Sequence, residues 1–272
     1  MKTVLIFFYM ALFCLGTGSA FAQITGPTRY VVYNYIKVLP GKYDDYMKLS
    51  KATKKINLEL KKAGKVDDWS LSEVLSPSGS STQYNFIARS AFIGEAQYAS
   101  TYEDNYWPAN WQSFLTLDEL NLFLKREEIR TVIKRETWVL LDNVLSDDTT
   151  TRGKIVVCNY FSIPEGKTNA DHTKVERDIW KPVHQARVKA GTMKGWLLMD
   201  MMLPFGTAYP YSSVTLDVYT DMKQYLMQSG MEDTFKKVHP GKDMNALWKQ
   251  TSEAAKITRG EVREIVDRLG WK

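Results

Sequence analysis

Few side chains in this sequence can move a proton near neutral pH. The chain has three histidines, His172, His184 and His239, and their spacing does not match a zinc-binding pattern. A histidine that opens into a pocket would act as a general base, so His184 and His239 are candidate catalytic residues. The alternative is that each histidine faces solvent or forms a structural hydrogen bond. His172 lies near an expected helix start.

Two carboxylates, Glu73 and Asp200, are the other catalytic candidates. They stand 127 residues apart, and each follows a tryptophan, Trp69 or Trp196, by four positions. If both point into an interface between two sheets, they would form a coupled pair with raised pKa values, which is a signature of function. If they point outward at sheet edges, they are ordinary surface charges.

Two asparagines on strands that are expected to be buried are candidate ligand-binding residues. A buried amide that loses its hydrogen bond costs about 1–3 kcal/mol, so each asparagine must contact either a ligand or a loop backbone. The candidate ligand-binding set consists of these asparagines and nearby aromatic residues: Asn34, Asn159, Trp69, Trp196, Tyr35 and Tyr160. The sequence shows no phosphate-binding glycine loop, no Ser-His-Asp triad and no metal site.

The sequence elements that would position these residues occur twice in the chain. Asn34-Tyr35 and Gly41-Lys42 recur 125 residues later as Asn159-Tyr160 and Gly166-Lys167, and Lys62-Ala63-Gly64 recurs 127 residues later as Lys189-Ala190-Gly191. The pattern predicts two copies of one unit.

Each copy has the same predicted order of elements. In the first copy we expect strands at 30–38, 69–75, 84–92 and 131–141, and a helix at 43–64 that ends at Gly64. The region 94–130 is predicted to be mainly helical, with an interruption at Trp107-Pro108. In the second copy we expect strands at 154–163, 196–203, 211–219 and 257–266, with helical regions at 169–190, bent or restarted at Pro182, and at 221–255. This β-α-β-β-α-β order predicts an α+β fold of two tandem ferredoxin-like domains.

The strands are apolar on both faces, although helices can cover only one face of each sheet. The economical arrangement packs the two copies sheet against sheet, as a pseudo-dimer within one chain. The polar segment 146–153 has no periodicity and is the predicted linker. The predicted domains are therefore 23–145 and 154–272.

The segment from Tyr30 to Tyr46, with its echo from Ile155 to Gly166, resembles the dimeric α/β barrel superfamily, which includes antibiotic-biosynthesis monooxygenases and NIPSNAP proteins. The resemblance implies an intramolecular α/β barrel with an aromatic-lined pocket between sheet and helices. Haem-degrading members carry an asparagine on the first strand, facing that pocket. Asn34 and Asn159 are similar to it in position.

Those haem-degrading enzymes also use a tryptophan and a histidine on the second helix. His239, four residues after Phe235, is similar in placement, but the matching tryptophan is absent. Pro240-Gly241 directly after His239 also fits a plain helix end, where the helix dipole favours a histidine. Haem therefore stays as an alternative, and the cofactor is otherwise unknown.

The N-terminus predicts export. Lys2 is followed by an apolar run over 4–15 and by Ala20-Phe21-Ala22, the pattern of a signal peptide (1–22) cleaved between Ala22 and Gln23. We expect a periplasmic or extracellular protein with no membrane span, since no other run approaches about 20 apolar residues. Cys158 would then be the single cysteine, which excludes an internal disulfide. The net charge of +5 is dispersed, which argues against nucleic acid.

Three functions agree with this sequence. The leading one is an enzyme similar to monooxygenases or cyclases of the superfamily, in which Asn159 orients an aromatic or polyketide-like ligand and His184 or His239 moves a proton. The second copy is favoured because it holds all three histidines. The alternatives are a non-catalytic ligand-binding or interaction module, and a haem-binding protein. The expected partner is a small molecule, and oligomerisation beyond the pseudo-dimer is left open.

Overall fold

The computed structural model describes residues 26–79, 82–147, 153–206, 208–227 and 230–270. The predicted signal peptide and most of the predicted linker lie outside these ranges. Within them, no helix has the length and apolar character needed to cross a membrane.

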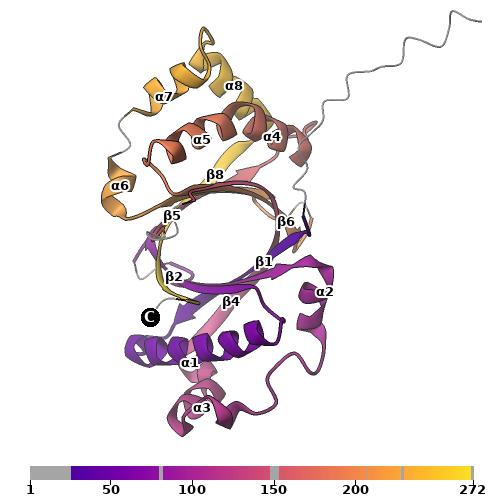
Figure 1. Ribbon diagram of the computed structural model, residues 1–272, viewed down its shortest axis with the longest axis vertical. Helices are drawn as coiled ribbons and strands as arrows, with labels where there is room; N and C mark the ends of the chain where they lie inside the picture. The colour runs from indigo at the N-terminus through magenta and orange to yellow at the C-terminus, as the bar shows by residue number, and fades with distance from the viewer. Residues whose placement is uncertain (1–25, 80–81, 148–152, 207, 228–229, 271–272) are drawn as a thin grey trace, which may run out of the picture.

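Eight antiparallel strands form a closed barrel, which Figure 1 shows from one end. Their order around the barrel is β1 (Arg29–Val38), β3 (Phe86–Ile93), β2 (Asp68–Ser76), β8 (Lys256–Arg268), β5 (Ile155–Ser162), β7 (Ser213–Tyr219), β6 (Gly195–Leu203) and β4 (Arg130–Leu145). Every predicted strand is present with shifted ends, and the α+β class is confirmed.

The barrel consists of two four-stranded sections, one from each predicted domain. β4-β1-β3-β2 come from the first half of the chain and β8-β5-β7-β6 from the second. The sections face each other as expected, and they are also joined edge to edge by the pairs β2·β8 and β4·β6. No barrel strand is therefore left with an unpaired edge. The shared interior holds residues of both halves: Tyr33, Tyr35, Tyr84, Trp138, Cys158, Tyr160 and Tyr211.

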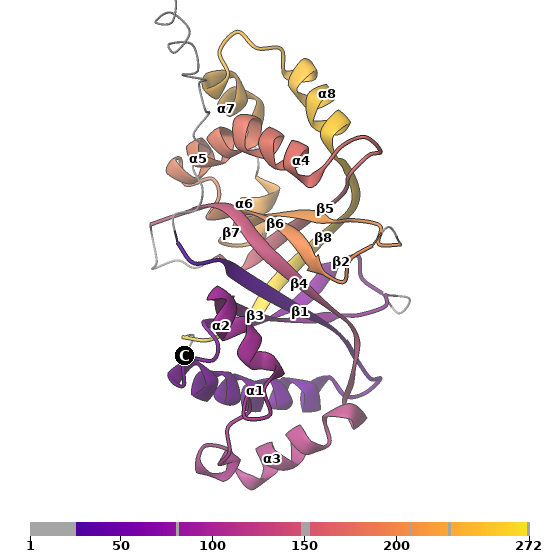
Figure 2. The ribbon, with the colours of Figure 1, turned by 90° about the vertical axis from the view of Figure 1, so that its right-hand side faces the viewer.

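Helices cover the outside of the barrel in two groups (Figures 1 and 2). The first half contributes α1 (Tyr43–Lys62), α2 (Gly94–Ala99) and α3 (Leu117–Leu124). The second contributes α4 (Asn169–Val175), α5 (Lys181–Lys189), α6 (Met222–Leu226), α7 (Met231–Val238) and α8 (Met244–Ala254). The region 94–130, predicted to be mainly helical with a break at Trp107-Pro108, holds α2, α3 and three short 3₁₀ helices, with irregular backbone at 103–110.

Helix α1 forms where the sequence changes from period two to helical spacing. Tyr46, Leu49 and Ile56 are buried along one face of α1, and two acidic residues occupy its first turn, where the helix dipole favours them. Gly64 follows with a positive φ of 72°, as expected for a glycine that ends a helix.

The matching helix of the second half is interrupted. Two more residues separate Gly166 from Gly191 than separate Gly41 from Gly64. A π-helical turn, Glu176–Trp180, lies in this interval between α4 and α5, and such turns accommodate extra residues in a helix. The restart expected at Pro182 falls in the first turn of α5.

Candidate functional site

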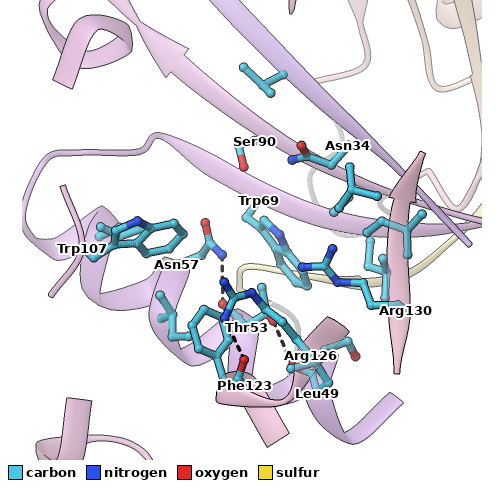
Figure 3. A pocket seen from close by; sticks show the side chains of 18 of the residues that line it. Asn34, Leu49, Thr53, Asn57, Trp69, Ser90, Trp107, Phe123, Arg126 and Arg130 are labelled. Carbon is cyan, nitrogen blue, oxygen red and sulfur yellow. Dashed lines mark hydrogen bonds between the residues drawn. The ribbon is translucent and has the colours of Figure 1, made fainter. Parts of the chain in front are cut away.

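A cavity of about 500 Å³ lies between the first half of the barrel and α1, beside α3 and the start of β4 (Figure 3). Seven aromatic side chains contribute to its wall: Tyr46, Trp69, Phe92, Tyr106, Trp107, Trp111 and Phe123. Such a volume and such walls are ordinary for a small-molecule site.

Strand β1 presents alternate residues to this cavity. Val32, Asn34 and Ile36 point outward to line it, whereas Tyr35 points into the barrel. Asn34 is half-buried and makes no side-chain hydrogen bond with the described residues. Its register neighbour on β3 is Ala88, and the short side chain of Ala88 leaves the space in front of the amide open.

Helix α1 supplies the opposite wall, where the polar groups are held by the helix itself. Asn57 Nδ2 donates to the Thr53 carbonyl at 2.9 Å, and Thr53 Oγ1 donates to the Leu49 carbonyl at 2.9 Å (Figure 3). The Asn57 amide is thereby fixed with its donor turned to the helix. Its carbonyl oxygen remains as an acceptor.

Two buried phenols in the wall stay protonated at neutral pH. Burial raises the pKa of Tyr106 to about 12 and raises that of Tyr46 above its ordinary value. Both can donate a hydrogen bond, and neither can act as a general base. The described lining residues include no histidine, cysteine, aspartate or glutamate.

Three arginines, Arg126, Arg130 and Arg135, also line the cavity. Arg126 Nη1 donates to the Phe123 carbonyl at 3.0 Å, and its guanidinium lies 4.8 Å from the centre of the Phe123 ring. Arg130 Nη1 is buried without a hydrogen bond from any described residue. Sequence reasoning missed all three, because it treated the basic residues as scattered surface charges.

In the second half, polar side chains occupy the corresponding layer. Asn159 takes the place of Asn34, and its Nδ2 lies 3.4 Å from Thr215 Oγ1. Nearby, His172 Nδ1 is 3.0 Å from Ser213 Oγ, and His172 Nε2 is 3.2 Å from Glu176 Oε1. This Ser-His-Glu chain is buried from solvent.

The two histidines predicted to be catalytic are also buried in the second half. His184 stacks on Trp196 with ring centres 5.3 Å apart, and burial together with Arg187 lowers its pKa to about 3. His239 Nε2 lies 2.8 Å from the Ile179 carbonyl oxygen, and its ring packs on Phe235. Neither histidine lines the cavity.

No histidine among the described residues is placed to bind haem iron in this cavity. All three histidines lie outside the cavity wall, and the nitrogen of His239 that would bind iron is engaged by a backbone carbonyl. No group of three or more His, Cys, Asp or Glu side chains in the described ranges could hold a metal ion.

The carboxylates Glu73 and Asp200 do not meet. Both point outward, on strands β2 and β6, which are not neighbours in the barrel. Glu73 lies 3.5 Å from the Tyr43 hydroxyl, and Asp200 lies beside Ser213. Burial raises the pKa of each carboxyl separately, so the structure contains no coupled pair of these two groups.

Tyr35 and Tyr160 do meet, inside the barrel, and their hydroxyl oxygens are 3.2 Å apart. Tyr35 donates to the wholly buried Glu136 at 2.6 Å. The same carboxylate accepts from Tyr211 at 2.7 Å. These tyrosines therefore belong to a buried network on the face opposite the cavity.

The counterpart of Glu136 in the second half, 125 residues later, is Glu261. Tyr84 donates to Glu261 at 2.7 Å, as Tyr211 donates to Glu136. Each of these bonds joins the two halves. The repeat offsets relate both pairs, so the network was predictable from a fuller comparison of the copies.

No family model and no curated protein matches the sequence. Solved structures do match the fold. An anthrone oxidase-like protein shares 10% identity over 90% of this chain and 94% of its own, with a TM-score of 0.50. A monooxygenase candidate from Lactobacillus acidophilus shares 10% identity over 89% of this chain and 94% of its own, with a TM-score of 0.49. A heme-binding protein from Thermus thermophilus shares 8% identity over 89% of this chain and 92% of its own, with a TM-score of 0.45.

The barrel described here is similar in general fold to that of the anthrone oxidase-like protein. At such low identity the likeness concerns the fold alone. The function has to be argued from the cavity.

Proposed function

We propose that this protein binds an aromatic small molecule in the first-half cavity. The observation that carries the proposal is the cavity itself, whose volume of about 500 Å³ and aromatic wall suit a ligand of several fused or linked rings. Trp69 and Trp107 offer ring faces for stacking. The unbonded amide of Asn34 provides a polar group that fixes the ligand's orientation.

Titration with N-phenyl-1-naphthylamine, a neutral aromatic probe whose fluorescence rises in apolar surroundings, tests this proposal. We expect saturable binding of one probe per chain. Ala88→Phe fills the cavity from β3 and should abolish binding, whereas Ala170→Phe, at an exposed position of α4, should leave it unchanged. Equal binding by both variants would contradict the assignment.

A monooxygenase- or cyclase-like reaction on that ligand is the second candidate. The observation that favours it is Asn34, since an amide without a partner in the wall would hold a ligand carbonyl and stabilise negative charge that develops on it. Oxygen consumption with anthrones and related polycyclic phenols is the measurement. Activity that is lost in Asn34→Ala while probe binding persists would establish the enzyme over the simple binder.

We also propose that the barrel is a tandem repeat of two ferredoxin-like units, an intramolecular pseudo-dimer. The strand orders β4-β1-β3-β2 and β8-β5-β7-β6 support it, since the second repeats the first with each strand replaced by its counterpart. The 125-residue relation between Tyr35 and Tyr160, which meet inside the barrel, supports it further.

Export remains part of the proposal, on the basis of the N-terminal sequence around Ala20-Phe21-Ala22. The full-length gene product should be recovered outside the cytoplasm with Gln23 as its first residue. Intact-mass measurement of the fractionated protein checks this. A cytoplasmic protein that retains Met1 would refute it.

A further inference from the structure

The cavity wall carries an unbalanced positive charge. Arg126, Arg130 and Arg135 all line it, and no acidic side chain is among the described lining residues. Arginine stays protonated at neutral pH even when burial lowers its pKa, as it does for Arg130. The aromatic pocket is therefore also a cationic one.

One carboxylate, that of Glu127, compensates this charge only in part. Arg130 and Arg135 form no ion pair with any described residue. Arg126 Nε lies 3.4 Å from Glu127, whose side chain is 65% exposed and is not part of the wall. Such an exposed pair contributes little.

Arg130 is the residue whose geometry requires a partner. It starts β4 opposite Val38, and its side chain extends beside the Trp69 ring, as Figure 3 shows. Its Nη1 atom is buried with no hydrogen bond from the described residues. A buried donor without an acceptor costs free energy, more so when it is charged. An acceptor supplied by a ligand would remove that cost.

The other two arginines mark the extent of the cationic wall. Arg126 lies near Arg130 and is held against Phe123 by its bond to the Phe123 carbonyl. Arg135 is the register neighbour of Asn34 on β4. The guanidinium groups thus border the space in which aromatic side chains would hold a ring.

We propose that the pocket selects an aromatic acid, with the anionic group on Arg130, assisted by Arg126, and the ring against Trp69 and Phe123. Guanidinium groups bind planar oxyanions through paired, charge-assisted hydrogen bonds. The inference rests on the proposed binding function and specifies its ligand class. A neutral aromatic ligand would leave the Arg130 donor unsatisfied and should bind more weakly.

Two probes that differ by one anionic group test the inference. They are 8-anilinonaphthalene-1-sulfonate and N-phenyl-1-naphthylamine, which share the arylamine scaffold. The wild-type protein should bind the sulfonate at least tenfold more tightly. Arg130→Gln should weaken sulfonate binding roughly ten- to hundredfold, the usual effect of losing hydrogen bonds to a charged group, and leave the neutral probe within about twofold.

Matched variants separate a specific contact from general effects. Arg29→Gln removes one charge from an exposed position of β1 outside the cavity wall and should change neither affinity. Arg130→Lys keeps the charge without the planar fork, so its sulfonate affinity should fall between wild type and Arg130→Gln. Ala88→Phe should abolish binding of both probes, which shows that the sulfonate occupies the cavity and not another apolar surface.

The outcomes distinguish this inference from the proposed function. Equal affinity of the wild type for both probes, or unchanged sulfonate binding in Arg130→Gln, overturns the selectivity for acids while the cavity remains a binding site. Parallel loss of both probes in Arg130→Gln overturns it as well, because Arg130 would then shape the cavity. Failure of both probes to bind the wild type refutes the proposed function itself.

Discussion

The two halves use the same layer between sheet and helices in opposite ways. On β3 the residues opposite Asn34 and Val32 are Ala88 and Ser90, and on β7 their counterparts are Thr215 and Asp217. Small side chains leave a cavity in the first half. Larger polar side chains occupy the equivalent positions in the second half, where the pocket beside Arg187 is smaller, about 190 Å³.

The facing helices repeat this contrast. Leu60 stands four residues before Gly64 and Arg187 four before Gly191. Leu60 lines the cavity, whereas the Arg187 side chain is buried and donates to the Tyr219 hydroxyl at 3.1 Å. The difference teaches that one arrangement of strands and helices can hold either a ligand space or a polar core, depending on a few facing positions.

The largest expected effect on stability comes from replacing Arg187, the buried arginine of the second half, and comparing it with the same change at Arg130 in the cavity wall. Arg187→Leu, which introduces the first-half residue, should destabilise the protein by about 4 kcal/mol because it leaves Tyr219 and Asp217 without their buried partner. Arg130→Leu should not lower stability, since it breaks no ion pair and removes a buried donor that has no acceptor among the described residues. Urea unfolding measures both, and equal losses would break the comparison.

The next largest expected effect is the pH dependence of the free energy of unfolding that His184, in the second half, should produce. The folded pKa of His184 is about 3, below its ordinary 6.5. Between these values the unfolded state binds the extra proton, so stability is constant above pH 6.5 and falls as the pH is lowered toward 3. The loss from pH 6.5 to pH 4 should reach about 3 kcal/mol.

His184→Asn installs the residue that stands at the equivalent helix position, Asn57, and should flatten this dependence. Urea unfolding at several pH values from 4 to 8 is the measurement. Asn57→Gln, in the cavity wall, serves as the control and should keep the wild-type pH profile. An unchanged slope in His184→Asn would mean that another group titrates.

Asp217 should produce the opposite trend, with a smaller size. Burial raises its pKa from 3.8 to about 7, so the folded state holds the proton between those values and stability falls as the pH rises toward 7. Asp217→Asn should therefore gain about 2 kcal/mol at pH 8, with allowance for the partial exposure of the residue. It should gain nothing at pH 4, and a gain at both pH values would refute the assignment.

The smallest effect tests the facing positions directly. Thr215→Ala removes a buried side chain whose hydroxyl lies 3.4 Å from the Asn159 amide, and should cost about 1 kcal/mol. Ala88→Thr, the reverse change in the first half, should stay within about 0.5 kcal/mol, because the cavity has room for it. Thermal unfolding of the pair checks this, and comparable costs would argue against the difference in packing.

Much of the fold was predictable, because it rests on local patterns. The apolar alternation of 30–38 and the helical spacing after Gly41 located β1 and α1 closely. In the region 94–130 the helices α2 and α3 follow the predicted helical pattern, whereas Tyr106 and Trp107 reach the cavity from irregular backbone at the predicted interruption. The edge pairing of β2 with β8 depends on contacts about 200 residues apart, which local patterns do not encode.

The site was less predictable. The period of two along β1 correctly places Asn34 and Tyr35 on opposite faces of the strand. The sequence does not indicate which of the two faces lines a cavity. That depends on the sizes of Ala88 and Ser90 across the sheet. The histidines directed the prediction to the second half, where His184 is buried with a lowered pKa and His172 and His239 are hydrogen-bonded.

The place of β8 in the barrel bears on the order in which the molecule is made. Lys256–Arg268 is synthesised after the other seven strands of the barrel, and it lies between β2 and β5, with Leu71 opposite Asp267. Until it emerges, one sheet edge of each half remains open, with unpaired backbone groups that invite association. The barrel therefore cannot close until β8 has been made, and a chain that stops before residue 256 should aggregate instead of yielding a working first half.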